Sequence, residues 1–189
     1  ENVGFGVEKR QVIELAWRGR PARGTVDLQV AVQLALNFRK RVVWIDGNFL
    51  SPQKKLLDHG RHTFSSLLMD PGSVDDLLSP DNPVLLAIGG QLRESRGILA
   101  DHRYEQLLHK LTQRFDFVIL DLPPVLSTTD TALMAEASDG FMLVIQQKRL
   151  KVEVIEHGLQ GLRDKGVNLL GSVINRRTYD LPKVIYDRL

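Results

Sequence analysis

Short apolar runs alternate along the chain with longer stretches in which apolar residues recur every three or four positions. The runs have the length of strands that are buried on both faces, and the longer stretches have the period of amphipathic helices. Six strands are predicted, at 12–17, 41–45, 84–88, 117–121, 141–145 and 169–174. This alternation is typical of a three-layer α/β domain, in which helices cover both faces of a mostly parallel sheet.

Three longer helices are predicted between these strands, at 26–38, 104–114 and 151–165. The segment 51–83 is less regular, because prolines and glycines interrupt it, and we interpret it as an insertion with short helices at 64–69 and 74–78. No repeat or linker divides the chain, so residues 1–189 are predicted to form a single domain. Because the sequence opens on Glu1 rather than Met, excision from a longer chain is an open alternative.

The composition excludes several functional classes. The 189 residues are 43% apolar and 25% charged, which is typical of a globular domain. The 25 basic and 23 acidic residues leave a net charge of +2, too even a balance for a surface that coats nucleic acid. No stretch approaches the ~18 consecutive apolar residues of a spanning helix. Without cysteine there are no disulfides or thiolate metal sites, and the histidines lack the pattern of a zinc site, so no metal is predicted.

Two of the predicted strands run into aspartate, Asp46 after the second and Asp121 at the end of the fourth. The carboxyl ends of parallel strands meet at one edge of an open sheet, where ligands usually bind, so both carboxylates are expected at that edge. Two convergent carboxylates indicate a metal–phosphate site. A single aspartate at a strand end can equally cap the following turn. Trp17 and Trp44 are interpreted as packing residues on neighbouring core strands.

In the order and spacing of several motifs, the chain resembles the cytoplasmic domain of the bacterial tyrosine kinases (BY-kinases) of capsule and exopolysaccharide export, relatives of the deviant-Walker partitioning ATPases. Leu120-Asp121-Leu122-Pro123-Pro124 is similar to the family's Walker B strand and its proline pair. Residues 129–130 and 137–144 resemble the family's segment after that strand, and 171–175 resembles the last strand, where the family's Asn, here Asn175, reads the adenine. The resemblance implies a P-loop NTPase-like fold.

The residues expected to bind phosphate depart from the family pattern. Counting back without gaps from Asp46 places the family's Gly-x-Gly-Lys-Ser/Thr loop on residues 18–26. Gly24 then stands at the lysine position and Arg23 at the position of the preceding glycine, while Thr25 keeps the magnesium-binding hydroxyl. Because arginine binds phosphate well, Arg20 and Arg23 leave a weak anion site open as an alternative to a solvated loop.

The family's Asp-x-Asp motif is also altered, since it reads Asp46-Gly47-Asn48 here and Leu50 replaces the expected Arg. Asn is a weaker metal ligand than a carboxylate and cannot act as a base at neutral pH. We therefore predict a vestigial nucleotide site without a catalytic residue. Its members are Arg20, Arg23, Gly24, Thr25, Asp46, Asn48, Asp121, Pro123 and Asn175.

The resemblance implies a catalytically impaired domain that regulates or scaffolds polysaccharide export at the inner face of the cell membrane. Its expected partner is a membrane polysaccharide co-polymerase or another export-complex protein, with no nucleic acid, and with membrane contact only through a partner or a fused segment. No cofactor is expected beyond weak binding of ATP or ADP and magnesium. The family's ring-forming Glu-x-x-Arg-x-x-Arg helix is not found, so the homo-oligomeric state is left open.

Two other functions stay open. One is an active ATP-dependent protein tyrosine autokinase with a remodelled phosphate loop, in which Thr25, Asp46 and Asp121 hold magnesium and Asn175 holds the base. The other is a nucleotide-binding switch without hydrolysis.

Overall fold

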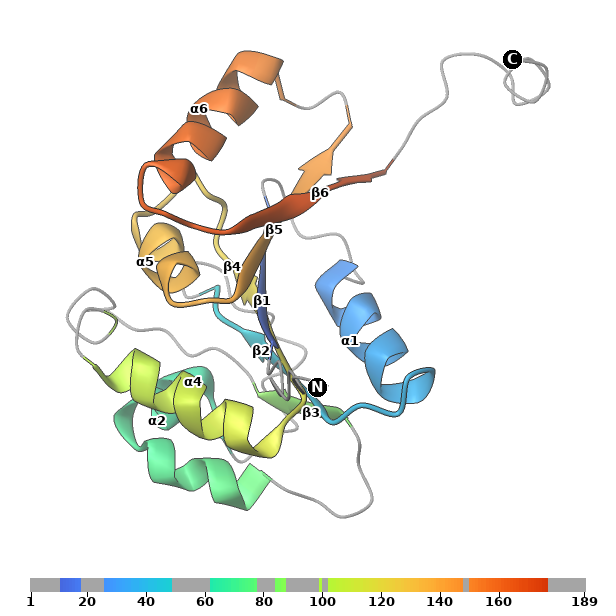
Figure 1. Cartoon of the computed structure of the whole chain (residues 1–189), viewed down its shortest axis with the longest axis vertical. Coiled ribbons are helices and arrows are strands. Elements are labelled where there is room, and N and C mark those ends of the chain that lie inside the picture. Colours follow the sequence, from blue (N-terminus) through green and yellow to red (C-terminus); the bar gives the residue numbers. More distant parts are fainter. Residues whose placement is uncertain are drawn as a thin grey trace, which may run out of the picture.

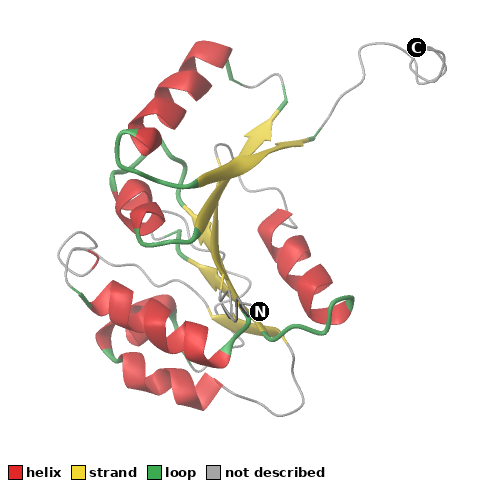
Figure 2. Cartoon of the chain, in the orientation of Figure 1, coloured by secondary structure: helices red, strands yellow, loops and turns green. Residues whose placement is uncertain are grey.

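Parallel strands form one open sheet with helices on both faces (Figures 1 and 2). The computed structural model describes residues 11–17, 26–48, 62–77, 84–87, 99, 102–147 and 150–176, with the backbone alone at 11–17 and 84–87. The strands are β1 (Gln11–Trp17), β2 (Val42–Asp46), β3 (Val84–Ala87), β4 (Phe117–Leu122), β5 (Gly140–Gln146) and β6 (Leu169–Asn175). The order is β3-β2-β4-β1-β5-β6, and every neighbouring pair is parallel. The predicted α/β class and the six predicted strands are confirmed.

The helices lie on the two faces of this sheet in unequal number. They are α1 (Val26–Leu36), α2 (Phe64–Met69), the 3₁₀ helix η1 (Pro71–Leu77), α4 (Arg103–Arg114), α5 (Asp130–Glu136) and α6 (Val152–Arg163). Helix α1 lies on one face, and α2, α4, α5 and α6 lie on the other (Figure 1). The short helix predicted at 74–78 is the end of η1. Helix α5 was not predicted, because its buried face includes the polar residues Asp130 and Thr131 and so lacks an apolar period.

Alternating side chains of the central strands point to opposite faces of the sheet and pack into two separate hydrophobic cores. On the α1 face, Val42 and Trp44 of β2 and Ile119 of β4 pack with alanines of the helix. On the other face the intervening strand residues pack against α2, η1 and α4, and the rings of Phe64 and Tyr104 meet edge to face at 6.3 Å. The described part of the predicted insertion therefore belongs to the second core.

The prediction that Trp17 and Trp44 lie on neighbouring strands is wrong. Strand β4 lies between β1, which carries Trp17, and β2, which carries Trp44. The side chain of Trp44 is fully buried and donates a hydrogen bond from its indole N–H to a carboxylate oxygen of Asp27, at 2.7 Å. It is thus a hydrogen-bonding residue as well as a packing one.

The starts of β2 and β4 are joined by Arg41 and Asp116. The Asp116 carboxylate accepts hydrogen bonds from the Arg41 backbone N–H at 2.8 Å and from its guanidinium at 3.0 Å. In return, the Arg41 carbonyl accepts from the backbone N–H of Asp116, at 2.8 Å. The guanidinium hydrogen bond is the main reason why the pKa of Asp116 lies below its ordinary value of 3.8.

We expect the Asp116→Asn substitution to lower the free energy of unfolding at pH 7 by at most about 1 kcal/mol, since both side chains are solvent-exposed. A lowered pKa in the folded state stabilises the protein above the unfolded pKa, and this contribution is lost as the pH falls through the folded pKa. The difference between variant and wild type should therefore be present at pH 7, shrink as the pH falls below 3.8, and be lost once the pH is below the folded-state pKa of Asp116. Urea unfolding across this range measures it; a difference that persists at low pH would contradict the assignment.

Candidate functional site

The two predicted aspartates lie side by side at the carboxyl edge of the sheet. Strands β2 and β4 are neighbours, and Asp46 is the register partner of Asp121. Asp46 is 0% exposed and Asp121 is 9% exposed. Because alternate strand residues share a face, both carboxylates lie on the same face as Trp44 and Ile119, which is the face covered by α1. The predicted convergence of the two carboxylates is confirmed.

The turn after β2 holds Asp46 against β4. The Asp46 carboxylate accepts a hydrogen bond from the backbone N–H of Asn48 at 3.0 Å, and the backbone N–H of Gly47 donates to the Asp121 carbonyl at 2.8 Å. A Cβ atom at Gly47 would lie 3.2 Å from that carbonyl, and equally close to the side chains of Leu122 and Met134. The close approach of the two strand ends therefore leaves little room for a larger residue at this position.

Pro123 belongs to the support of this site. It is buried directly after β4, and its carbonyl accepts a hydrogen bond from the Thr131 hydroxyl in α5, at 2.9 Å. The next carbonyl, of Pro124, accepts from the backbone N–H and the hydroxyl of Ser127, at 2.8 and 2.6 Å. These bonds fix the turn by which the chain leaves Asp121.

Asn175 lies at the same edge of the sheet but apart from the carboxylates. It ends β6, which is three strands away from β4 in the sheet order, so roughly 14 Å separate the two strands. Its side-chain carbonyl accepts a hydrogen bond from the Arg176 backbone N–H at 2.7 Å, and its backbone carbonyl accepts from Gln147 N–H at 3.1 Å. The carboxylate pair and Asn175 thus mark two ends of one long edge.

Arg20, Arg23, Gly24 and Thr25 lie outside the described residues, so their predicted roles remain predictions. Their segment connects β1 to α1. Strand β1 runs between β4 and β5, and its residue Leu15 is the register partner of Asp121. The carboxyl end of β1 therefore lies beside the carboxylate pair and between the two ends of the edge.

A third buried carboxylate was missed by the sequence interpretation. Asp27 lies in the first turn of α1, is 4% exposed, and accepts the hydrogen bond from Trp44. Trp44 precedes Asp46 by two residues on β2 and lies on the same face. The only available signal was an acidic residue immediately after the expected phosphate loop.

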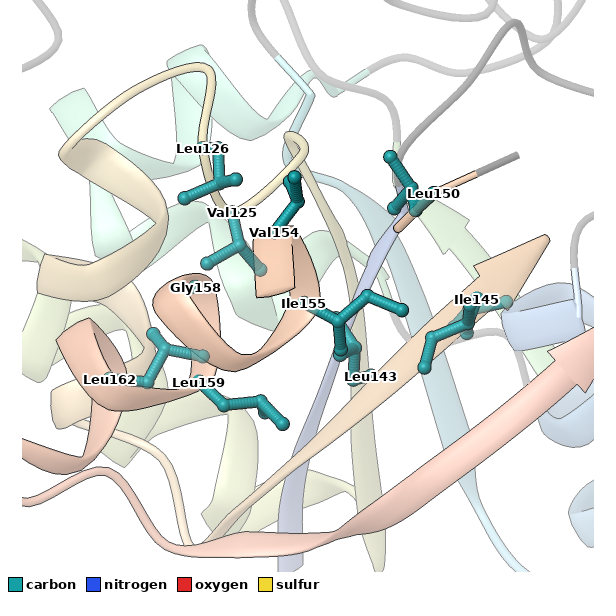
Figure 3. A pocket seen from close by; sticks show the side chains of 11 residues that line it. Val125, Leu126, Leu143, Ile145, Leu150, Val154, Ile155, Gly158, Leu159 and Leu162 are labelled. Carbon is teal, nitrogen blue, oxygen red and sulfur yellow. The ribbon is translucent and has the colours of Figure 1, made fainter. Parts of the chain in front are cut away.

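An apolar hollow lies between α6, β5 and the turn after Pro124 (Figure 3). Val125 and Leu126 line it from the turn, Ile145 from β5, and Val154 and Ile155 from α6. Its lining consists of apolar side chains and a glycine, so it is unsuited to bind phosphate or a metal ion.

Neither a clustered metal site nor a membrane span is found in the part of the chain that the structure describes. Across those residues, no three or more His, Cys, Asp and Glu side chains gather into a group that could hold a metal ion. No described helix is both long and apolar enough to cross a membrane.

Replacing Gly47 by Ala should separate the ends of β2 and β4. The added methyl group meets a backbone carbonyl that cannot move freely, so we expect the free energy of unfolding to fall by about 1–3 kcal/mol. Gly161→Ala is the matched control, because a Cβ there meets nothing within 4 Å and helix α6 should gain stability. Urea unfolding compares the two; equal stability of the variants would show that the strand ends are not tightly held.

No family model matches the chain. Among curated proteins, the chain is 30% identical over 79 residues to the tyrosine-protein kinase CpsD of Streptococcus agalactiae, a match that spans 42% of this chain and 34% of CpsD. It is 21% identical to CapB of Staphylococcus aureus over 187 residues, which span 95% of this chain and 82% of CapB. The matched segment thus spans about a third of CpsD.

Solved structures extend the likeness over most of the chain. The chimerical protein CapA2B2 has a TM-score of 0.78 and 21% identity, covering 90% of this chain and 77% of its own. The BceF tyrosine kinase domain has a TM-score of 0.68 and 28% identity, with coverage of 87% and 68%. Cobyrinic acid a,c-diamide synthase from Mycobacterium smegmatis, solved with ADP and magnesium, shares the fold at a TM-score of 0.63 and 19% identity, with coverage of 95% and 82%.

The order of the motifs, the paired carboxylates and these similarities agree. The chain is similar in part of its sequence to bacterial tyrosine-protein kinases, and it has the P-loop NTPase-like α/β fold of their kinase domains.

Proposed function

We propose that this chain is a catalytically impaired BY-kinase-like domain that regulates or scaffolds the export of bacterial capsule or exopolysaccharide. The observation that carries the proposal is the balance of charge at the site, where buried carboxylates are present and the expected lysine is not. The described residues bring buried carboxylates to the α1 face of the sheet edge, at Asp27, Asp46 and Asp121. The sequence offers Gly24 where the family resemblance expects the phosphate-binding lysine.

Electrostatics explains why this arrangement disfavours catalysis. A nucleoside triphosphate brings several negative charges toward buried carboxylates, and in a partly desolvated site like charges repel each other more strongly than in water. Magnesium can offset part of this repulsion if Asp46 and Asp121 hold it with the hydroxyl of Thr25. Without a lysine, the γ-phosphate still lacks a fixed cation at the place where charge develops during phosphoryl transfer. Arg20 and Arg23 lie in the expected loop and fit a weak anion site better than a catalytic one.

A specific observation favours a second function. Asp46 and Asp121 are in register, which fits a magnesium site, and one of the structural neighbours was solved with ADP and magnesium. An active tyrosine autokinase, or a switch that binds nucleotide without hydrolysis, would use this pair together with Thr25 to hold magnesium. Asn175 would bind the adenine base of the nucleotide.

Melting temperature with and without magnesium-ATP separates the three functions. A ligand at about 100 times its Kd adds about 2.7 kcal/mol, which for a domain of this size raises the melting temperature by roughly 5–11 °C. We expect no such shift at millimolar magnesium-ATP. A large shift with labelled phosphotyrosine would establish the kinase and overturn the proposal, and a shift without phosphate transfer would establish the switch. Asp121→Asn is the control, because it should abolish a shift that depends on magnesium.

The proposed partner is a membrane polysaccharide co-polymerase, which would hold the domain at the inner face of the membrane. The apolar hollow between α6, β5 and the turn after Pro124 supports this part of the proposal, because it suits an apolar side chain of a protein segment. The family resemblance and the chimeric nature of the CapA2B2 neighbour also fit a domain that works joined to a second component.

Co-purification with the co-polymerase encoded or fused beside this chain tests the docking. A leucine at Gly158 should reduce recovery of the partner several-fold, because a Cβ there already lies 3.5 Å from Leu126 and a longer side chain would fill the hollow. Gly161→Leu adds the same side chain to the same helix at an open position, and should leave recovery unchanged. Failure of wild type to associate in detergent extracts would contradict the docking, and equal recovery for both variants would place the contact elsewhere.

A further inference from the structure

The turn that joins α1 to β2 combines exposed apolar and cationic side chains. Leu36 ends α1 and is 65% exposed, and Phe38 in the turn is 66% exposed. Arg39, Lys40 and Arg41 follow directly, and all three are exposed. A single exposed leucine is ordinary on a protein surface, but a leucine and a phenylalanine beside three consecutive cations form a mixed surface that suits an amphipathic partner.

Two of the three cations are available to an external anion. The Arg41 guanidinium pairs with the Asp116 carboxylate at 3.0 Å, which offsets one positive charge. Arg39 and Lys40 form no ion pair within the part of the chain that the structure describes. The turn therefore carries a positive charge that the fold itself does not neutralise.

Backbone hydrogen bonds hold the turn in one conformation. The Asn37 N–H donates to the Gln33 carbonyl at 2.9 Å, and the Lys40 N–H donates to the Leu34 carbonyl at 3.2 Å, so the turn is closed onto the end of α1. Arg39 has a φ of 51°, in the left-handed region that favours glycine. The backbone thus accepts a costly conformation at a residue whose exposed side chain is charged, as binding surfaces often do.

The turn lies at the opposite edge of the sheet from the carboxylates. Strand β2 starts at Val42, directly after the turn, and ends at Asp46, so roughly 13 Å of strand separate the two places. Figure 1 shows α1 on one face of the sheet, apart from α2, α4, α5 and α6. A partner that binds at this turn therefore leaves the carboxylate pair uncovered.

We propose that residues 36–41 form a docking surface for a lipid bilayer that carries anionic headgroups. Leu36 and Phe38 enter the headgroup region, while the cations remain at the level of the lipid phosphates. A nucleic acid would use the cations and leave both apolar side chains in water, and an apolar groove of a protein would bury Arg39 and Lys40 at a cost. The proposed function brings the domain to the membrane through a partner. A direct contact goes beyond that function and does not depend on it.

Flotation of the whole chain with lipid vesicles tests the proposal. At about 0.15 M salt we expect the chain to float with vesicles of equal parts phosphatidylcholine and phosphatidylglycerol, and not with phosphatidylcholine alone. Raising the salt to about 1 M should release much of it, because charges are then screened within about 3 Å. Lys40→Gln should weaken binding about fivefold, the contribution of one cation near an anionic surface. Phe38→Ser should weaken it several-fold without a change of charge.

Lys151→Gln and Val152→Ser are the matched controls. They change the same kinds of side chain at the start of α6, where Lys151 is exposed and Val152 is 64% exposed, and they should leave vesicle binding unchanged. Binding to neither kind of vesicle, equal binding to both, or an equal loss in the controls would overturn the proposal.

Phe38→Trp supplies a second measurement that does not depend on charge. Its fluorescence, compared with that of wild type, should shift to shorter wavelength when anionic vesicles are added, because the indole leaves water. An unchanged spectrum would show that residue 38 stays in water, and would overturn the proposal even if the chain floats. Neither measurement needs the co-polymerase or nucleotide, so this inference and the proposed function can fail separately.

Discussion

The pairing of β2 with β4 is the constraint on which the sheet edge depends. It sets Asp46 beside Asp121. The hydrogen bond from Gly47 N–H to the Asp121 carbonyl holds the carboxyl ends of the two strands together. A slip of one residue would turn one carboxylate to the opposite face, into a core of leucines and aromatic rings. Because that core excludes an unpaired charge, packing on the far face of the sheet helps to fix the geometry of the site on the near face.

Much of the fold was predictable because buried parallel strands have a strong signature in the sequence. The strand runs are nearly all apolar, α4 and α6 have a clear helical period, and α1 is an apolar stretch of helical length, so the sequence predicts these elements within a few residues. The carboxylate pair followed from the same reasoning, since two strands ended in aspartate and parallel strands present their ends together. Helix α5 was not predicted from the sequence, because the polar residues Asp130 and Thr131 occupy its buried face, where apolar residues are expected.

Strand order and side-chain partners were much harder to infer. Nothing in the sequence around Trp17 and Trp44 indicates that β4 lies between their strands, so the two residues were wrongly placed on neighbours. The bond between Trp44 and Asp27 joins residues 17 positions apart and depends on how α1 lies across the sheet. The hollow is built from the turn after Pro124, β5 and α6, so no single stretch carries a signal for it. The predicted loss of the phosphate loop rests on residues outside the described part and remains a prediction.

The buried carboxylates also bear on how the domain is stabilised. A desolvated carboxylate is costly unless donors surround it, so each one in a folded domain must be compensated. Asp46 receives the Asn48 backbone N–H, and Asp27 receives the Trp44 indole together with the positive end of α1. In a site that needs a cation or nucleotide to be complete, part of this compensation would come from the ligand. Here Asp46 and Asp27 each find a donor within the chain itself, so part of this compensation does not depend on a ligand. A domain organised in this way can hold its fold, and so present its surface to a partner protein, whether or not nucleotide is bound.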